Sequence, residues 1–194
     1  MKIYNYSHSL KDICESDVPT VFLAGPTVRT HQSHLRSWRP DAIAEFNKQG
    51  FEGDIIIPEF HGGTLPENVR VFSWLPAWEH HGLSGCDAIM FWVPRTTEMI
   101  GLTTNHELGY WTANRREKVV YGRPNDALSI DYTDFMWYAD AEQKGFEPAR
   151  IETTLADTVK ATIALIEKSR FRTNLPSTRR QQSAITVPSP FGPF

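Results

Sequence analysis

The stretch at residues 87–93, DAIMFWV, decides the fold, because it is almost continuously apolar and stops at Pro94. A strand that is apolar on both faces is typical of a parallel sheet covered by helices on both sides. Two similar runs precede it, at Thr20–Ala24 (TVFLA) and at 54–58 (DIIIP), and a shorter one follows at 118–121 (KVVY). We therefore expect four buried strands.

Helical patterns separate these strands. The first spans residues 35–48, and its Pro40 suits a first turn, which puts the start of the helix near Arg39. Two more cover residues 69–83 and 104–114. This order predicts an α/β fold with a parallel sheet between two layers of helices. In such sheets ligands bind beyond the carboxyl ends of the strands, so functional residues are expected in the segments that follow them.

The C-terminal third is less regular. Residues 125–145 are rich in aromatic and acidic side chains, and we interpret them as containing one edge strand. Residues 153–169 predict a closing helix whose apolar side chains form one stripe. Residues 170–194 carry four prolines without periodicity. They predict a tail that is flexible or packs on a neighbour, after a single domain at 1–169.

Composition narrows the possible partners. The net charge of −3 and the scattered Lys and Arg residues give no basic face for a nucleic-acid polymer, although a small anionic ligand remains compatible. The two cysteines, Cys14 and Cys86, show no CxxC spacing and indicate an intracellular chain without a disulfide framework. No signal-peptide or membrane-span pattern is present, so we expect a cytoplasmic protein that makes no membrane contact.

The segment TTNHELGYW at residues 103–111 admits two interpretations. Thr104 followed three residues later by Glu107 matches a capping box, in which both residues serve only to start a helix. The second interpretation uses the same geometry for chemistry. In the first turn of a helix the dipole favours an ionised Glu107, and a carboxylate at the ligand edge of a sheet is suited to attack a sugar carbon.

Four segments together resemble the nucleoside 2-deoxyribosyltransferase-like family, whose superfamily includes 2′-deoxynucleoside 5′-monophosphate N-glycosidases. They are FLAGP at 22–26, SWR at 37–39, CDAIMFWVP at 86–94 and NHELGYW at 105–111. The resemblance extends over residues 21–122, about half of the chain. It implies a three-layer flavodoxin-like or Rossmann-like sheet and a homo-oligomer whose sites are completed by neighbouring subunits.

The resemblance also implies a pair of catalytic acids. Glu107 matches the nucleophile of the ELGY motif, and Glu79 falls where relatives usually carry a second acid, an Asp. A solvated helix carboxylate is the alternative for Glu79. Relatives often have an Asp before the motif, and Glu98 is the only nearby substitute here. Phe22 replaces a Tyr that some relatives have on the first strand.

The expected substrate-binding residues lie after the first strand, with Glu98 and Thr104 as two further ones before Glu107. Gly25 and Pro26 form its turn, and Arg29 is suited to a 5′-phosphate unless it is only an exposed loop residue. Arg39 could also bind substrate, or pair with an acid beside the site. Asp87 is expected to have a structural role at the amino end of its strand, far from the ligand edge.

Cofactor and metal motifs are missing from the sequence. The seven histidines include no HExxH pattern and no Cys at zinc-ligand spacing, so we expect no metal site. Gly25 and Pro26 are not followed by the further glycines or the Lys of a dinucleotide or Walker loop, so we expect no cofactor.

The expected function is cleavage or transfer at the N-glycosidic bond of a nucleoside or nucleotide through a covalent glycosyl-Glu intermediate. Two alternatives stay open. The first is a nucleotide-binding sensor or accessory protein without turnover, which the missing Tyr and Asp would explain. The second is an N-glycosidase that acts on ribonucleotides or nicotinamide nucleotides with the same acids.

Overall fold

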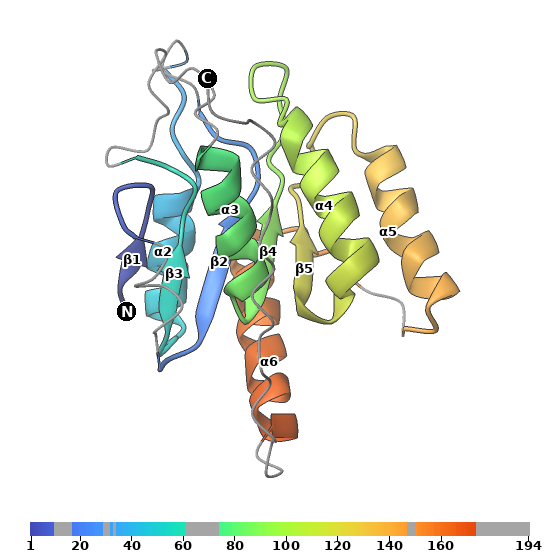
Figure 1. The fold of residues 1–194 in the computed structure, drawn as a ribbon. Helices are drawn as coiled ribbons and strands as arrows, with labels where there is room; N and C mark the ends of the chain where they lie inside the picture. Colours follow the sequence, from blue (N-terminus) through green and yellow to red (C-terminus); the bar gives the residue numbers. More distant parts are fainter. Residues whose placement is uncertain (10–16, 29–31, 33, 61–73, 147–149, 174–194) are drawn as a thin grey trace, which may run out of the picture.

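A computed structural model describes residues 1–9, 17–28, 32, 34–60, 74–146 and 150–173, with the backbone alone at 171–173. Its centre is a five-stranded, all-parallel sheet with the strand order β1-β3-β2-β4-β5 (Figure 1). The strands are β1 Ile3–Tyr4, β2 Thr20–Ala24, β3 Asp54–Ile56, β4 Ala88–Trp92 and β5 Val119–Gly122. The four expected strands are confirmed within one or two residues at their ends.

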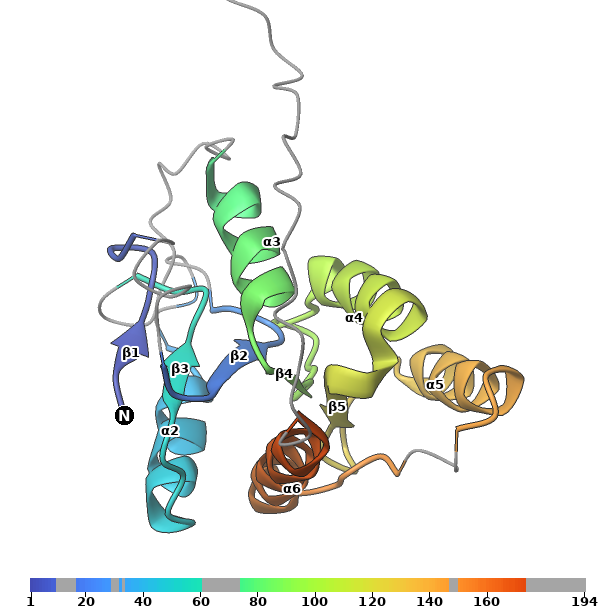
Figure 2. The ribbon, with the colours of Figure 1, turned by 60° about the horizontal axis from the view of Figure 1, so that its bottom comes forward.

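Helices cover both faces of the sheet. They are α2 Arg39–Lys48, α3 Trp74–Gly85, α4 Leu102–Arg115, α5 Asp131–Gln143 and α6 Leu155–Thr173, with a 3-10 turn η2 at Arg116–Lys118. Figure 2 shows α3, α4 and α5 on one side and α2 and α6 on the other. The expected three-layer, Rossmann-like α/β architecture is thereby confirmed.

Alternating side chains of the central strands belong to two separate hydrophobic cores, one on each face of the sheet. In β2, Phe22 points to the core under α3 and α4, whereas Val21 and Leu23 point to the core under α2 and α6. In β4, Phe91 and Met90 divide in the same way. Successive residues of a strand face opposite sides, so a sheet buried on both faces requires continuously apolar strands.

The sheet order places a topological switch point at the carboxyl ends of β2 and β4, where the chain has turned from one side of β2 to the other. Gly25 lies there with φ 148°, and a Cβ on it would lie 2.2 Å from the carbonyl oxygen of Trp92. No side chain fits at that distance. Glycine is therefore required where the loop after β2 crosses the end of β4.

Three features differ from the sequence-based expectation. β1 was not expected, because a strand of two residues is too short to show alternation; it pairs with β3 through Ile3 and Ile55. The edge strand expected within 125–145 is wrong, since those residues form α5. The closing helix is confirmed but continues to Thr173, inside the expected tail, and residues 174–194 lie outside the described residues.

The carboxylate of Asp134 explains why α5 packs where it does. It accepts hydrogen bonds from the Tyr121 hydroxyl (2.9 Å) and from Nε and Nη2 of Arg123 (3.0 and 2.6 Å). The apolar residues of α5 follow no single stripe, and Trp137 is its main buried aromatic residue. Polar anchors to β5 therefore supplement weak apolar patterning, which is why periodicity did not identify this helix.

Among the helices described, none combines the length and the apolar character needed to cross a membrane.

Candidate active site

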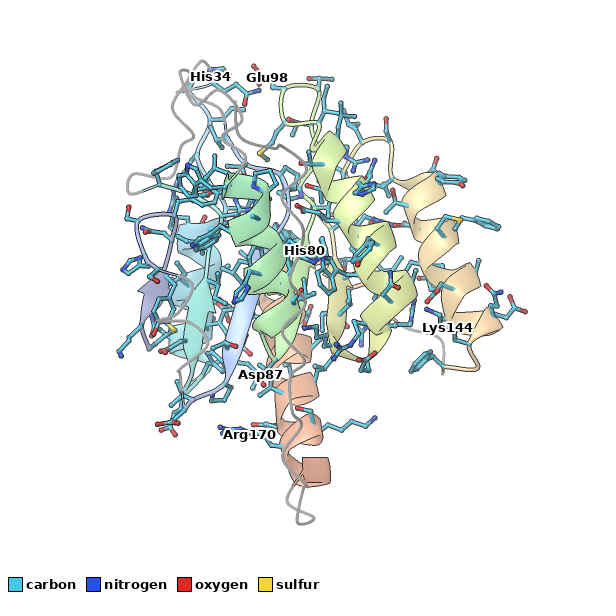
Figure 3. All side chains as sticks on the ribbon, viewed as in Figure 1. His34, His80, Asp87, Glu98, Lys144 and Arg170 are labelled. Carbon is cyan, nitrogen blue, oxygen red and sulfur yellow. The ribbon has the colours of Figure 1, made fainter. Side chains whose placement is uncertain are left out.

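Two acids from neighbouring helices meet in a cavity of about 310 Å³ between α3 and α4. Glu79 projects from α3 and Glu107 from α4, and each side chain is half-buried. The cavity is also lined by two histidines and two aromatic residues, namely His80, His106, Tyr110 and Trp111. Figure 3 shows the side chains of the two helices, with His80 labelled on α3. The two acids implied by the resemblance are thus brought together.

The pattern of buried residues on each helix explains this placement. On α3, Trp78 and Leu83 face the sheet, so Glu79 lies at the edge of the buried face. On α4, Leu108 and Trp111 are buried, and Glu107 precedes Leu108 at the corresponding edge. Helices that pack side by side on one sheet bring such edge positions together, which makes the two carboxyl groups neighbours.

Electrostatics leaves the pair with a shared proton near neutral pH. Burial, the charge of Glu79 and a hydrogen bond with Glu79 raise the pKa of Glu107 to about 8, and the Arg39 cation partly opposes this rise. Two adjoining carboxylates cannot both ionise cheaply, so one of them keeps its proton. At neutral pH Glu107 is therefore the member of the pair that favours its protonated form.

The capping box expected at Thr104 and Glu107 is wrong, and so is the reason given for an ionised Glu107. The helix begins at Leu102 after Gly101, whose φ of 62° makes it the N-cap residue, and there is no side-chain cap. Glu107 consequently lies in the second turn. The favourable effect of a helix dipole is confined to the first turn, so burial determines the protonation of Glu107.

Tyr6 is a site residue that the sequence did not reveal. It follows β1, is buried, and donates a hydrogen bond from its hydroxyl to Oε1 of Glu79. Its ring packs against Trp78 of α3 with centroids 5.0 Å apart, next to Phe22 of β2. Phe22 of β2 has no hydroxyl, but Tyr6, in the segment after β1, supplies one to the acid pair. Only the unexpected strand β1 explains how it gets there.

Arg39 does not reach the acid cavity as a substrate ligand. Its side chain is fully buried and donates to Oε1 of Glu59 (2.6 Å) and to the carbonyl oxygen of Leu23 (3.0 Å). Nη2 also binds the carbonyl oxygen of Gly25 (2.9 Å). The alternative expectation was pairing with an acid, and Arg39 does pair with one, Glu59, which does not line the acid cavity. Arg39 acts on the acids through its charge and by holding the loop after β2.

The loops that follow β2 and β4 pack against each other through three of the expected site residues, namely Gly25, Pro26 and Thr104. A Cβ on Gly101 would lie 2.7 Å from Cγ of Pro26 and 3.2 Å from Oγ1 of Thr104, so the three residues are tightly packed. Pro26 and Thr104 are buried, and neither they nor Gly25 line the acid cavity. Their observed role is to pack the loops that follow β2 and β4 against the start of α4.

The remaining expected ligands are not gathered at the acids. Glu98 is exposed, pairs with His34 at 2.8 Å and receives a hydrogen bond from the Gln32 amide on its carbonyl oxygen. Figure 3 shows Glu98 and His34 together, away from His80. Arg29 lies outside the described residues. The structural role expected for Asp87 is confirmed, because its Oδ2 accepts from the N–H and the hydroxyl of Thr20 at 2.8 and 3.2 Å.

A second cavity among the described residues shares no lining residue with the acid cavity. It has a volume of about 940 Å³ and lies at the amino ends of β1 and β3, where Asp54 accepts the Lys2 N–H at 2.7 Å and the Tyr4 hydroxyl at 3.4 Å. That carboxylate stabilises the sheet edge. Across the described part of the chain, no three His, Cys, Asp or Glu side chains are grouped so as to hold a metal ion.

No protein-family model matches the chain, and no significantly similar relative was found among curated proteins.

Proposed function

We propose that this protein cleaves or exchanges the N-glycosidic bond of a nucleoside or nucleotide and belongs to the nucleoside 2-deoxyribosyltransferase-like family. The observation that carries the proposal is the pair Glu79 and Glu107, which share a proton in a cavity beside aromatic side chains. A charged and a protonated carboxyl group are the two components that retaining glycosidases use. The cavity is large enough for part of a nucleoside.

The reaction requires one acid to attack and the other to protonate the leaving base. Glu107, the nucleophile by resemblance, first passes its proton across the shared hydrogen bond to Glu79. An oxygen of Glu107 then bonds to the anomeric carbon while the bond from this carbon to the base nitrogen breaks. The electron pair stays on the base, which takes the proton from Glu79. Water or a second base later attacks the anomeric carbon and gives its proton to Glu79, while the bond from this carbon to Glu107 breaks and Glu107 leaves as a carboxylate.

Aromatic residues beside the acids support binding of a planar base. Trp111 is buried, its ring centroid lies 5.2 Å from that of Tyr110, and half-exposed Tyr110 forms part of the cavity wall. The ring of His80 packs against Trp111 at 5.6 Å. Such a wall stacks on the flat face of a purine or pyrimidine with little dependence on the identity of the base.

Release of free base is the test of this proposal. We expect the protein to liberate base from 2′-deoxynucleosides or their 5′-monophosphates, followed by chromatography, and ribonucleosides and nicotinamide nucleotides form the comparison series. Glu107→Gln should lower turnover at least about 100-fold, since a carboxamide neither attacks nor shares the proton. Glu167→Gln, an exposed change on α6 across the sheet, should turn over normally. Equal activity of the Glu107 variant and the parent would reject the proposal.

A homo-oligomer is part of the same proposal. Large apolar side chains are exposed on α4 and α5, with Leu102 and Tyr132 each 75% accessible and Phe135 64% accessible. Exposed apolar side chains on two neighbouring helices support contact with a second copy of the chain. Light scattering should give a mass above that of one chain, and Tyr132→Ser together with Phe135→Ser should lower it.

A further inference from the structure

We propose that Tyr6 is a positioning residue that fixes the charge of the acid pair on Glu79 and directs any proton on Glu79 to its second oxygen, Oε2. The role in catalysis rests on the proposed function, whereas the effect on the ionisation of the pair does not. Tyr6 lies outside every motif that the sequence analysis connected with the site. Its position comes from β1 and the segment that follows it.

Packing fixes the Tyr6 hydroxyl in one place. The backbone N–H of Tyr6 donates to the carbonyl oxygen of Glu59 at 3.2 Å, which continues the contact between β1 and β3 beyond the ends of both strands. Its ring contacts Phe60 at 5.1 Å and Trp78 at 5.0 Å between centroids. Nε1 of Trp78 donates to the carbonyl oxygen of His8 at 3.1 Å, so the segment after β1 is tied to α3. The phenol therefore has little freedom to leave Glu79.

The direction of the hydrogen bond is determined by burial. Desolvation, followed by the neighbouring Glu79 charge, raises the pKa of Tyr6 well above its ordinary value, so the phenol keeps its proton. The hydroxyl is consequently the donor and Oε1 of Glu79 the acceptor. A hydrogen bond to a carboxylate is stronger than one to a neutral carboxyl group. Tyr6 thus favours the charged form of Glu79 and leaves the shared proton on Glu107.

The same contact orients Glu79 after proton transfer. Because Oε1 accepts a hydrogen bond from the Tyr6 hydroxyl, it is favoured as the carbonyl oxygen, and the proton that Glu79 receives from Glu107 is favoured on Oε2. That oxygen remains available to the departing base. Tyr6 would then contribute to turnover without touching substrate. Substrate affinity should be little changed when only its hydroxyl is removed.

The sign of the effect on ionisation can be derived for Tyr6→Phe. Tyr6 stabilises Glu79 whenever Glu79 is charged, both in the singly charged and in the doubly charged pair. Its removal therefore shifts the loss of the first proton to higher pH, by about one pH unit. Loss of the second proton, from Glu107, stays where it was. The other titratable or charged groups near the pair are Arg39 of α2, His80 of α3, and His106 and Tyr110 of α4.

Carbon-13 NMR of glutamate-labelled, ligand-free protein tests this directly. Glu79→Gln and Glu107→Gln assign the two carboxyl signals, which are then followed over pH in the parent and in Tyr6→Phe. We expect the first transition to move up by about one unit and the second to stay in place. Circular dichroism verifies that the variant is folded, which is expected because phenylalanine keeps the ring contacts.

Tyr121→Phe is the matched control. Tyr121 lies on β5, away from the cavity, and its buried hydroxyl donates to the carboxylate of Asp134. Removing this hydroxyl should leave both transitions of the acid pair unchanged. Unchanged transitions in Tyr6→Phe, or equal shifts in both variants, would overturn the inference. If the shift occurs in a protein that releases no base, the proposed function fails while the inference stands. In an active protein, Tyr6→Phe should lower kcat about tenfold, with KM nearly constant and the acid limb of the pH profile shifted upward.

Discussion

Burial beside a second acid makes the ionised form of Glu107 unfavourable in the folded chain, which is what the proposed function expects of a catalytic acid. Its carboxyl group is largely removed from water and faces a second carboxyl group, Glu79. A neutral side chain would satisfy the same position at lower cost. At the scale of single residues, the acid pair therefore lowers the stability of the folded chain. The hydroxyl of Tyr6 donates a hydrogen bond to one member of this pair, Glu79.

The pH dependence of the free energy of unfolding should reveal the destabilising effect of Glu107. Between the ordinary pKa of 4.5 and the raised value of about 8, folded Glu107 holds a proton that the unfolded chain has released. The raised pKa therefore lowers the free energy of unfolding progressively across this window, and the loss is complete above it. Glu107→Gln removes the titration. Relative to the parent, the variant should gain on the order of 1–3 kcal/mol between pH 5 and pH 9.

Urea unfolding at the two pH values measures this difference. Glu167→Gln provides the control, because that exposed side chain lies on α6, on the other face of the sheet. Its effect should be small and the same at both pH values. A Glu107→Gln offset that does not change with pH would mean that Glu107 is ionised in the folded protein at neutral pH.

At the scale of elements, the position of α3 depends on a buried lysine at its C-terminal end. Nζ of Lys118 donates to the carbonyl oxygens of Leu83 (2.9 Å), Ser84 (2.8 Å) and Cys86 (3.0 Å). Burial lowers the pKa of Lys118, yet the ammonium group complements the negative end of the helix dipole. Because α3 carries Glu79, this cap also supports the acid pair.

Replacing Lys118 with Met should lower the free energy of unfolding by about 2–4 kcal/mol, because buried carbonyl groups lose their donor. Lys48→Met is the matched control. Lys48 is exposed and pairs with Glu45 on the surface of α2, so its loss should cost about 0.5 kcal/mol or less. Denaturant unfolding of both variants makes the comparison. Equal effects would show that Lys118 does not hold the end of α3.

At the scale of the whole molecule, the central sheet was readable from the sequence because burial on both faces leaves an unmistakable record. Every residue of β4 is buried, and the motif glutamate directly precedes buried Leu108 on the next helix. What local pattern could not show was contact between distant segments. Tyr6 meets Glu79 across 73 positions of sequence, and Arg39 meets Glu59 across 20. A two-residue strand and a buried ion pair have no periodic signature.

The same reasoning explains the errors within the site. The spacing of Thr104 and Glu107 fits a capping box, but Gly101, in a left-handed conformation, starts the helix earlier. For Arg39 the sequence left open whether it binds substrate or pairs with an acid. Its charge is satisfied by Glu59 and by backbone carbonyl groups. Tertiary contacts, which a single sequence does not display, decided both cases.

The most direct test of the account is mass spectrometry of the intact protein after rapid quenching with a 2′-deoxynucleoside, followed by peptide mapping. The account predicts one deoxyribosyl group attached to Glu107 and no adduct in Glu107→Gln. An adduct mapped to any other side chain, or one that persists in Glu107→Gln, would contradict it.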